Sequence, residues 1–142
     1  SLLQMSTTIF FRWTYVYLMR VKQSLMKTNL IKCKWLASGK DKKQIQKMAL
    51  EWLDVVEKHY GVKPIIYSGY RFRRDILSDK KFNEYPFWMA HYYVSEPAKD
   101  IKWHFWQHTD CGKLSGIRGP VDCNVFIGTM AELKDMLIKE LP

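Results

Sequence analysis

The sequence has no acidic residues over its first part, few cysteines anywhere, and no long apolar runs. Residues 1–40 contain no Asp or Glu, although they hold seven of the 23 Lys and Arg residues of this 142-residue chain. The three cysteines, Cys33, Cys111 and Cys123, are too irregularly spaced for a disulfide framework, so reduced thiols are expected. The longest apolar stretch near the start, residues 9–19, is interrupted by Arg12 and is too short to cross a bilayer. These absences exclude a disulfide scaffold and predict no membrane span.

The positive charge is unevenly distributed along the chain. The net charge is +9, yet residues 41–142 hold all fourteen acids and sixteen basic residues, a balance of only +2. A basic arm at residues 1–40 favours nucleic acid or another anionic polymer. The alternative interpretation, which we favour, is an atypical segment whose sequence was not selected for a soluble surface. With 47% hydrophobic and 15% aromatic residues, the chain has enough apolar material for one folded domain.

Residues 41–142 alternate between helical and extended patterns. Apolar residues recur at spacings of three and four over residues 41–60, which predicts an amphipathic helix that Ser38 or Asp41 caps and Gly61 ends. The other expected elements are strands at 65–67, 86–93, 103–107 and 121–126, a short helix at 71–77, and a last helix from Thr129 to Leu141. Strands that alternate with helices indicate an α/β fold class.

Four short motifs follow one another in this second part of the chain. In order they are Pro64-Ile65-Ile66-Tyr67-Ser68-Gly69-Tyr70, Phe87-Trp88-Met89-Ala90-His91-Tyr92, Phe105-Trp106-Gln107-His108-Thr109-Asp110 with Gly112, and Gly116-Ile117 with Gly119, Val121-Asp122, Asn124 and Phe126. The ordered series resembles the C-terminal half of glycoside hydrolase family 25, the Chalaropsis-type lysozymes or N-acetylmuramidases. The resemblance covers about residues 36–142.

The resemblance implies a fold and a reaction. The fold of the family is an irregular TIM-like β/α barrel whose last strands lack helices. A complete barrel needs about 200 residues or more, so we expect an incomplete or truncated TIM-like barrel here. The implied reaction is hydrolysis of the β-1,4 bond between N-acetylmuramic acid and N-acetylglucosamine, with peptidoglycan glycan strands as the partner and no cofactor.

Candidate site residues lie at or near the predicted carboxyl ends of the strands, where a β/α barrel builds its site. The substrate-binding candidates are Tyr67, Trp88, Tyr92 and Trp106. Aromatic faces suit sugar rings, and phenol and indole groups can bind hydroxyls; core packing is the alternative interpretation. By resemblance Asp122 matches the aspartate of Val-Asp-x-Asn and is the catalytic candidate, although composition alone describes a turn aspartate. We expect Tyr67, Trp88, Trp106 and Asp122 to converge on one concave surface.

The acid pair of the family is missing from this sequence. Its Asp-x-Glu motif is expected just before the helix at 41–60, where this chain has Lys32-Cys33-Lys34. An amine does not donate a proton at pH 7 as a carboxylic acid does, and glycoside hydrolysis needs two carboxyl groups. Because Asp110 is predicted to lie in a turn, we expect no second carboxylate near Asp122. The sequence therefore predicts glycan affinity with little or no turnover.

Three functions remain open at this point: a muramidase-family enzyme of doubtful activity, a non-catalytic peptidoglycan-binding remnant, and, on charge alone, a nucleic-acid-binding module. We expect no nucleic-acid partner. His104 and His108, with the cysteines that follow them, lack the close spacing of a zinc site, so no metal is expected. No export signal is recognisable, and the localisation is left unknown.

Overall fold

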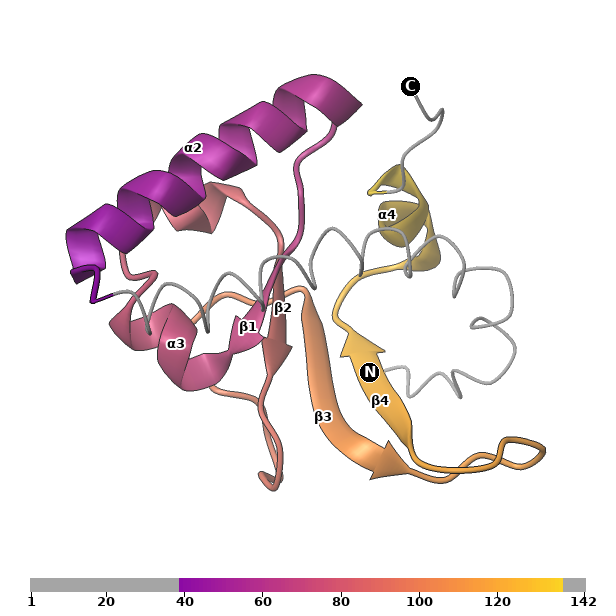
Figure 1. Cartoon of the computed structure of the whole chain (residues 1–142). Helices are drawn as coiled ribbons and strands as arrows, with labels where there is room; N and C mark the ends of the chain where they lie inside the picture. Colours follow the sequence, from indigo (N-terminus) through magenta and orange to yellow (C-terminus); the bar gives the residue numbers. More distant parts are fainter. Residues whose placement is uncertain (1–38, 137–142) are drawn as a thin grey trace.

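The computed structural model describes residues 39–136, which form a four-stranded sheet with helices packed on it (Figure 1). The strand order is β1-β2-β3-β4; the first three strands run parallel, and β4 runs antiparallel to β3. The predicted α/β fold class is confirmed. The expected behaviour of residues 1–38 and the predicted end of the last helix lie outside the described residues.

Helix α2 (Lys42–Tyr60) is the longest element and confirms the helix expected at 41–60. Of the two candidate caps, Asp41 is the one used: its Oδ1 accepts from the Gln44 backbone N–H at 2.9 Å, and Gln44 Oε1 accepts from the Asp41 N–H at 3.1 Å. Gly61 ends the helix in a left-handed conformation, φ 67°, which a glycine adopts without steric penalty.

The middle of the chain contains two strands and two short helices. Strand β1 (Ile66–Gly69) leads directly into helix α3 (Tyr70–Asp75) and then into a 3-10 helix, η1 (Lys80–Glu84). Strand β2 (Phe87–Ala90) follows, and no helix separates it from β3. Helix η1 was not predicted, because its single buried residue, Phe82, sets no helical periodicity.

The second half differs from the sequence prediction in the lengths of its strands. Strand β2 ends at Ala90 instead of Tyr93, and Tyr93 has a positive φ of 59° that turns the chain away from the sheet. Strand β3 (Phe105–Gly112) continues well past Gln107, so the turn predicted around Asp110 is wrong. The polar residues 108–111 resemble a turn in sequence, yet they pair with β4 through two register shifts.

Of the last two elements, β4 matches its prediction, whereas the last helix begins as predicted and ends at Asp135, before the predicted Leu141. Strand β4 (Val121–Phe126) has the predicted bounds. Helix α4 (Met130–Asp135) begins with the predicted capping box, in which the Thr129 side chain accepts from the Glu132 N–H and the Glu132 side chain accepts from the Thr129 N–H.

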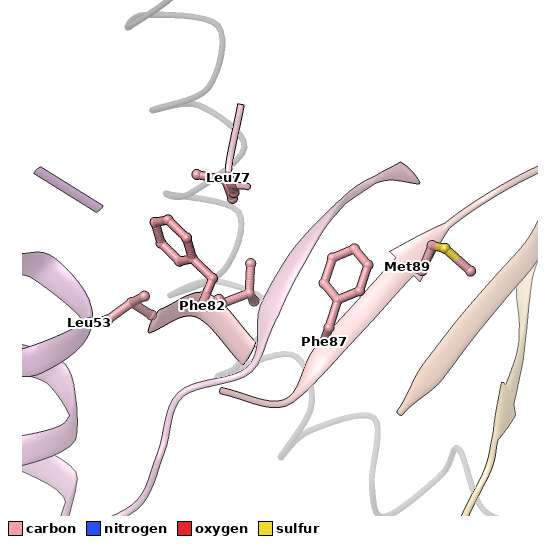
Figure 2. Packing of buried hydrophobic residues seen from close by; sticks show 6 residues of the cluster. Leu53, Leu77, Phe82, Phe87 and Met89 are labelled. Carbon is pink, nitrogen blue, oxygen red and sulfur yellow. The ribbon is translucent and has the colours of Figure 1, made fainter. Parts of the chain in front are cut away.

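Two apolar clusters cover the two faces of the sheet, because successive strand side chains point to opposite faces. The first joins α2 and η1 to the sheet (Figure 2); its buried members are Leu53, Ile66, Leu77, Phe82, Phe87 and Met89. The second lies on the other face; its buried members are Ile65, Trp88 and Phe105, with Leu133 and Met136 packed against them from α4 and its end. The face without α2 is the one that presents Tyr67 and Trp88.

Candidate functional site

The strand register places a set of polar and aromatic side chains on one face. Tyr67 pairs with Trp88, Trp88 with Phe105, and Gln107 with Asn124. Residues paired across a sheet point to the same side, as do residues two apart along a strand. Tyr67, Trp88, Gln107 and Asn124 therefore share the face opposite α2, toward the carboxyl ends of the parallel strands.

Gln107 is the centre of this face. Its side-chain carbonyl Oε1 accepts a hydrogen bond from the Tyr67 hydroxyl at 2.6 Å and a second, short one from the Tyr92 hydroxyl. Gln107 is only 2% exposed, and the two phenols occupy both lone pairs of its oxygen. A buried amide thus holds two aromatic rings in a defined orientation.

Trp88 is fixed in the same way from the neighbouring strands. Its indole Nε1–H donates to Asn124 Oδ1 at 2.8 Å, and its ring meets the Tyr67 ring edge-to-face with centroids 5.3 Å apart. Trp88 is buried, whereas Tyr67 and Tyr92 are half-buried and so lie at the accessible side of the cluster. The three predicted aromatic residues Tyr67, Trp88 and Tyr92 are therefore brought together.

The environment of Tyr92 includes a hydroxyl partner and two acidic residues. Burial and a hydrogen-bonding interaction with Tyr67 raise the pKa of the Tyr92 phenol well above its ordinary value. The negative charges of Asp110 and Asp122 raise that pKa further. The pairs Thr109 with Cys123 and Gly112 with Val121 bracket these two aspartates on adjacent strands. Asp110 and Asp122 thus lie on adjacent strands, whereas the sequence pattern predicts a turn at Asp110.

Trp106 does not belong to this face, and its predicted place beside Tyr67 and Trp88 is wrong. It pairs with Met89 and Val125, and its ring packs against the cluster under α2. Its Nε1–H donates to the His91 backbone carbonyl at 2.9 Å. The period of a strand is two residues, so Trp106 and Gln107 must face opposite sides. In this motif, Gln107 is the residue on the face that carries Tyr67 and Trp88.

Gln107, Asn124 and Asp110 were not predicted as site residues. Alternation along β3 offered a signal for Gln107, since a polar residue between Phe105 and a following polar run stands on the same side as Phe105. Nothing comparable marked Asp110, because its position depends on the irregular pairing of β3 with β4.

Residues 39–136 contain no group of three or more His, Cys, Asp or Glu side chains able to hold a metal ion. His104 has a structural contact instead: its Nδ1 accepts from the Phe87 backbone N–H at 3.2 Å. Cys111 and Cys123 are free thiols. None of the helices within this described range combines the length and apolar character that a membrane-spanning helix needs.

Comparison with known proteins identifies similar sequences and folds. The family model described as Glycosyl hydrolases family 25 matches residues 16–117. The uncharacterized protein YegX of Escherichia coli K12 is 52% identical over 103 residues, which cover 70% of this chain and 38% of that protein. This chain therefore spans well under half of that curated relative.

Solved structures give the same similarity. A lysozyme from Streptomyces coelicolor matches with a TM-score of 0.62 at 26% identity, covering 69% of this chain and 48% of that one. A family 25 glycosyl hydrolase from Bacillus anthracis matches with a TM-score of 0.60 at 28% identity, covering 71% and 48%. The family match begins at residue 16, within the segment 1–40, and ends at 117, before Asp122 and Asn124.

Proposed function

The chain belongs to glycosyl hydrolase family 25, and on that premise we propose that its aromatic face binds the glycan strands of peptidoglycan. The substrate is the polymer in which N-acetylmuramic acid and N-acetylglucosamine alternate through β-1,4 bonds. One observation carries the proposal: two phenols converge on the buried Gln107 carbonyl beside an indole fixed by Asn124. This arrangement is oriented in advance, so little ordering accompanies ligand binding.

The chemistry of the face suits a sugar. The ring faces of Tyr67 and Tyr92 can pack against the C–H face of a pyranose, while their phenol oxygens accept from sugar hydroxyls. Both phenol hydroxyls donate to Gln107, which fixes the orientation of the two rings on this face. Asp122, half-buried in β4, adds a charged acceptor on the same side of that strand as Asn124.

The architecture agrees with this placement. We interpret residues 41–142 as the C-terminal half of an incomplete TIM-like β/α barrel, with β1, β2 and β3 as its parallel strands. In such barrels ligands bind at the carboxyl ends of the strands, and Tyr67, Tyr92 and Asp122 lie toward that edge. Residues 1–40 are then an atypical addition to this half.

Binding without efficient hydrolysis is the function that this chain supports best. The reaction needs one carboxyl group that protonates the leaving oxygen and a second that stabilises or attacks the sugar. Lys32-Cys33-Lys34 occupies the place where the family has Asp-x-Glu. Loss of general acid catalysis alone lowers the rate by about a hundredfold to ten-thousandfold.

The experiment is a pair of measurements on the purified chain. Sedimentation with insoluble peptidoglycan measures binding, and clearing of a cell-wall suspension measures hydrolysis. We expect the chain to sediment with peptidoglycan and to leave the turbidity unchanged. Efficient clearing that Asp122→Asn abolishes would contradict binding without turnover, and failure to sediment would contradict the glycan site itself.

A second candidate function is hydrolysis by the chain itself. One observation favours it: Asp110 and Asp122 lie on adjacent strands, and the charges of both act on Tyr92. In this case Asp122 is catalytic and Asp110 is the second carboxylate. Clearing activity that Asp110→Asn and Asp122→Asn each abolish would establish this function, whereas activity that persists in Asp110→Asn would remove Asp110 from it.

A further inference from the structure

Tyr93 combines an unfavourable backbone with an exposed aromatic ring. It is the one residue other than glycine between 39 and 136 with a positive φ, 59°, and its side chain is 88% exposed. The left-handed region suits glycine and asparagine, and a bulky residue there is strained. Burial of the ring does not compensate for this strain. Strained residues of this kind gather at functional sites, so the ring needs an explanation outside the fold.

The position of Tyr93 supplies that explanation. It directly follows Tyr92, whose hydroxyl is bound to Gln107, and the two phenol rings meet edge-to-face with centroids 6.4 Å apart at 81°. The loop that carries Tyr93 leaves the carboxyl end of β2, at the edge of the sheet where β3 also ends (Figure 1). The left-handed turn thus leaves one aromatic ring in the site and the next one beside it in solvent.

We propose that Tyr93 is a sugar-stacking residue that extends the glycan site by one further N-acetylhexosamine unit beyond Tyr67, Trp88 and Tyr92. This inference rests on the proposed function. A tyrosine ring gives a large amphipathic contact surface and has few rotatable bonds to immobilise. A glycan strand is a long ligand, so a sugar bound at Tyr92 has neighbours that leave the site past its rim. Tyr93 is the exposed ring in contact with Tyr92 there.

The test compares ligand lengths in variants of the full chain. Tyr93→Asn removes the ring and keeps a residue that tolerates the left-handed turn, whereas Tyr93→Phe keeps the ring and removes the hydroxyl. Calorimetry would measure binding of a soluble hexasaccharide and a disaccharide of alternating N-acetylglucosamine and N-acetylmuramic acid. We expect Tyr93→Asn to weaken hexasaccharide binding about fivefold, with disaccharide binding unchanged. Tyr93→Phe should retain most of the affinity.

Stability and a distant control separate binding from folding. Because the turn is strained with tyrosine, Tyr93→Asn should leave the melting temperature unchanged or raised. Val55→Ala, at a side chain 63% exposed on α2, should change neither affinity.

Three results would overturn the inference, and they differ in what they say of the proposed function. Equal hexasaccharide binding by the parent chain and Tyr93→Asn overturns the role of Tyr93 and leaves the glycan site intact. A lower melting temperature together with equal losses for both ligands makes Tyr93 a structural residue. Absence of binding by the parent chain to either saccharide and to insoluble peptidoglycan removes the proposed function and this inference together.

Discussion

Both faces of the sheet carry large aromatic and apolar side chains, but they differ in the hydrogen bonds that these side chains make. Under α2, Leu53, Phe87 and Met89 pack as apolar groups that need no hydrogen-bond partner (Figure 2). On the other face the rings of Tyr67 and Trp88 also pack together, but each has a polar atom bound to a polar side chain from another strand. The first arrangement serves stability, and the second also fixes the direction of the rings.

On the proposed glycan face, the hydrogen bonds of buried polar groups combine stability with ring orientation. A buried amide such as Gln107 destabilises a fold unless its polar atoms are paired, and here two phenols pair its oxygen. The same bonds that compensate for burial also orient the rings that we propose to bind the glycan. Substitutions under α2 should therefore change stability without changing glycan binding, whereas substitutions around Gln107 should change both.

The largest effect is expected from the face under α2. Phe82→Ala removes a ring that is 1% exposed in the cluster with Leu53 and Leu77, so unfolding in urea should show a loss of about 3–5 kcal/mol. Glycan affinity, measured on the folded fraction at low temperature, should not change. A parallel loss of affinity in folded protein would mean that the two faces are not separable.

A smaller effect on stability, joined to a large effect on binding, is expected at Gln107. Gln107→Met keeps the approximate volume but leaves the hydroxyls of Tyr67 and Tyr92 without their acceptor, a loss of about 1–3 kcal/mol in urea unfolding. Sedimentation with peptidoglycan should fall as well, because both rings lose their orientation. Ser68→Ala, at a polar residue that is 3% exposed and pairs with Met89 on the other face, is the control and should leave sedimentation unchanged. Equal sedimentation by both variants would show that stability and glycan binding are not coupled at Gln107.

The two tryptophans give a matched comparison between the faces. Trp88→Phe and Trp106→Phe each remove one indole hydrogen bond, of 2.8 and 2.9 Å respectively. Each should lower the free energy of unfolding by about 1 kcal/mol. Calorimetry should show weaker glycan binding, by about fivefold, only for Trp88→Phe. Weaker binding in Trp106→Phe would restore the prediction that Trp106 is a substrate-binding residue.

Much of the fold could be predicted from local signals. Helix α2 is indicated by its apolar spacing, by Asp41 with Gln44 at its start and by Gly61 at its end. Strand β4 and the capping box at Thr129 follow equally local rules. Local signals do not predict the length of β3. Residues 108–111 become a strand only through pairing with β4, and a polar sequence does not specify that pairing.

The site was predictable in part for the same reason. Tyr67, Trp88 and Tyr92 were found from their motifs, and the strand register brings them together. Trp106 was predicted to bind substrate because it is a large aromatic residue in the motif. Strand alternation instead puts its neighbour Gln107 on the face with Tyr67 and Trp88. Asp122 stays the catalytic candidate. Asp110 lies on the adjacent strand because of a strand pairing that the sequence pattern does not predict.

The smallest effect is expected at His104, which directly precedes β3. It concerns the pH dependence of stability, and glycan binding should not share it. Burial, followed by the charge of Lys102, lowers the pKa of His104, whose Nδ1 accepts from the Phe87 N–H and must be unprotonated to do so. In the unfolded chain His104 therefore binds a proton near pH 6.5, whereas in the folded chain it binds one only at lower pH. The free energy of unfolding should therefore fall as the pH drops below 6.5. Urea unfolding between pH 7 and 5 should show this decline. His104→Asn retains an acceptor that does not titrate, and it should flatten the decline while glycan sedimentation at pH 7 stays the same. An equally steep decline in His104→Asn would assign the pH dependence to other groups and leave His104 without a part in it.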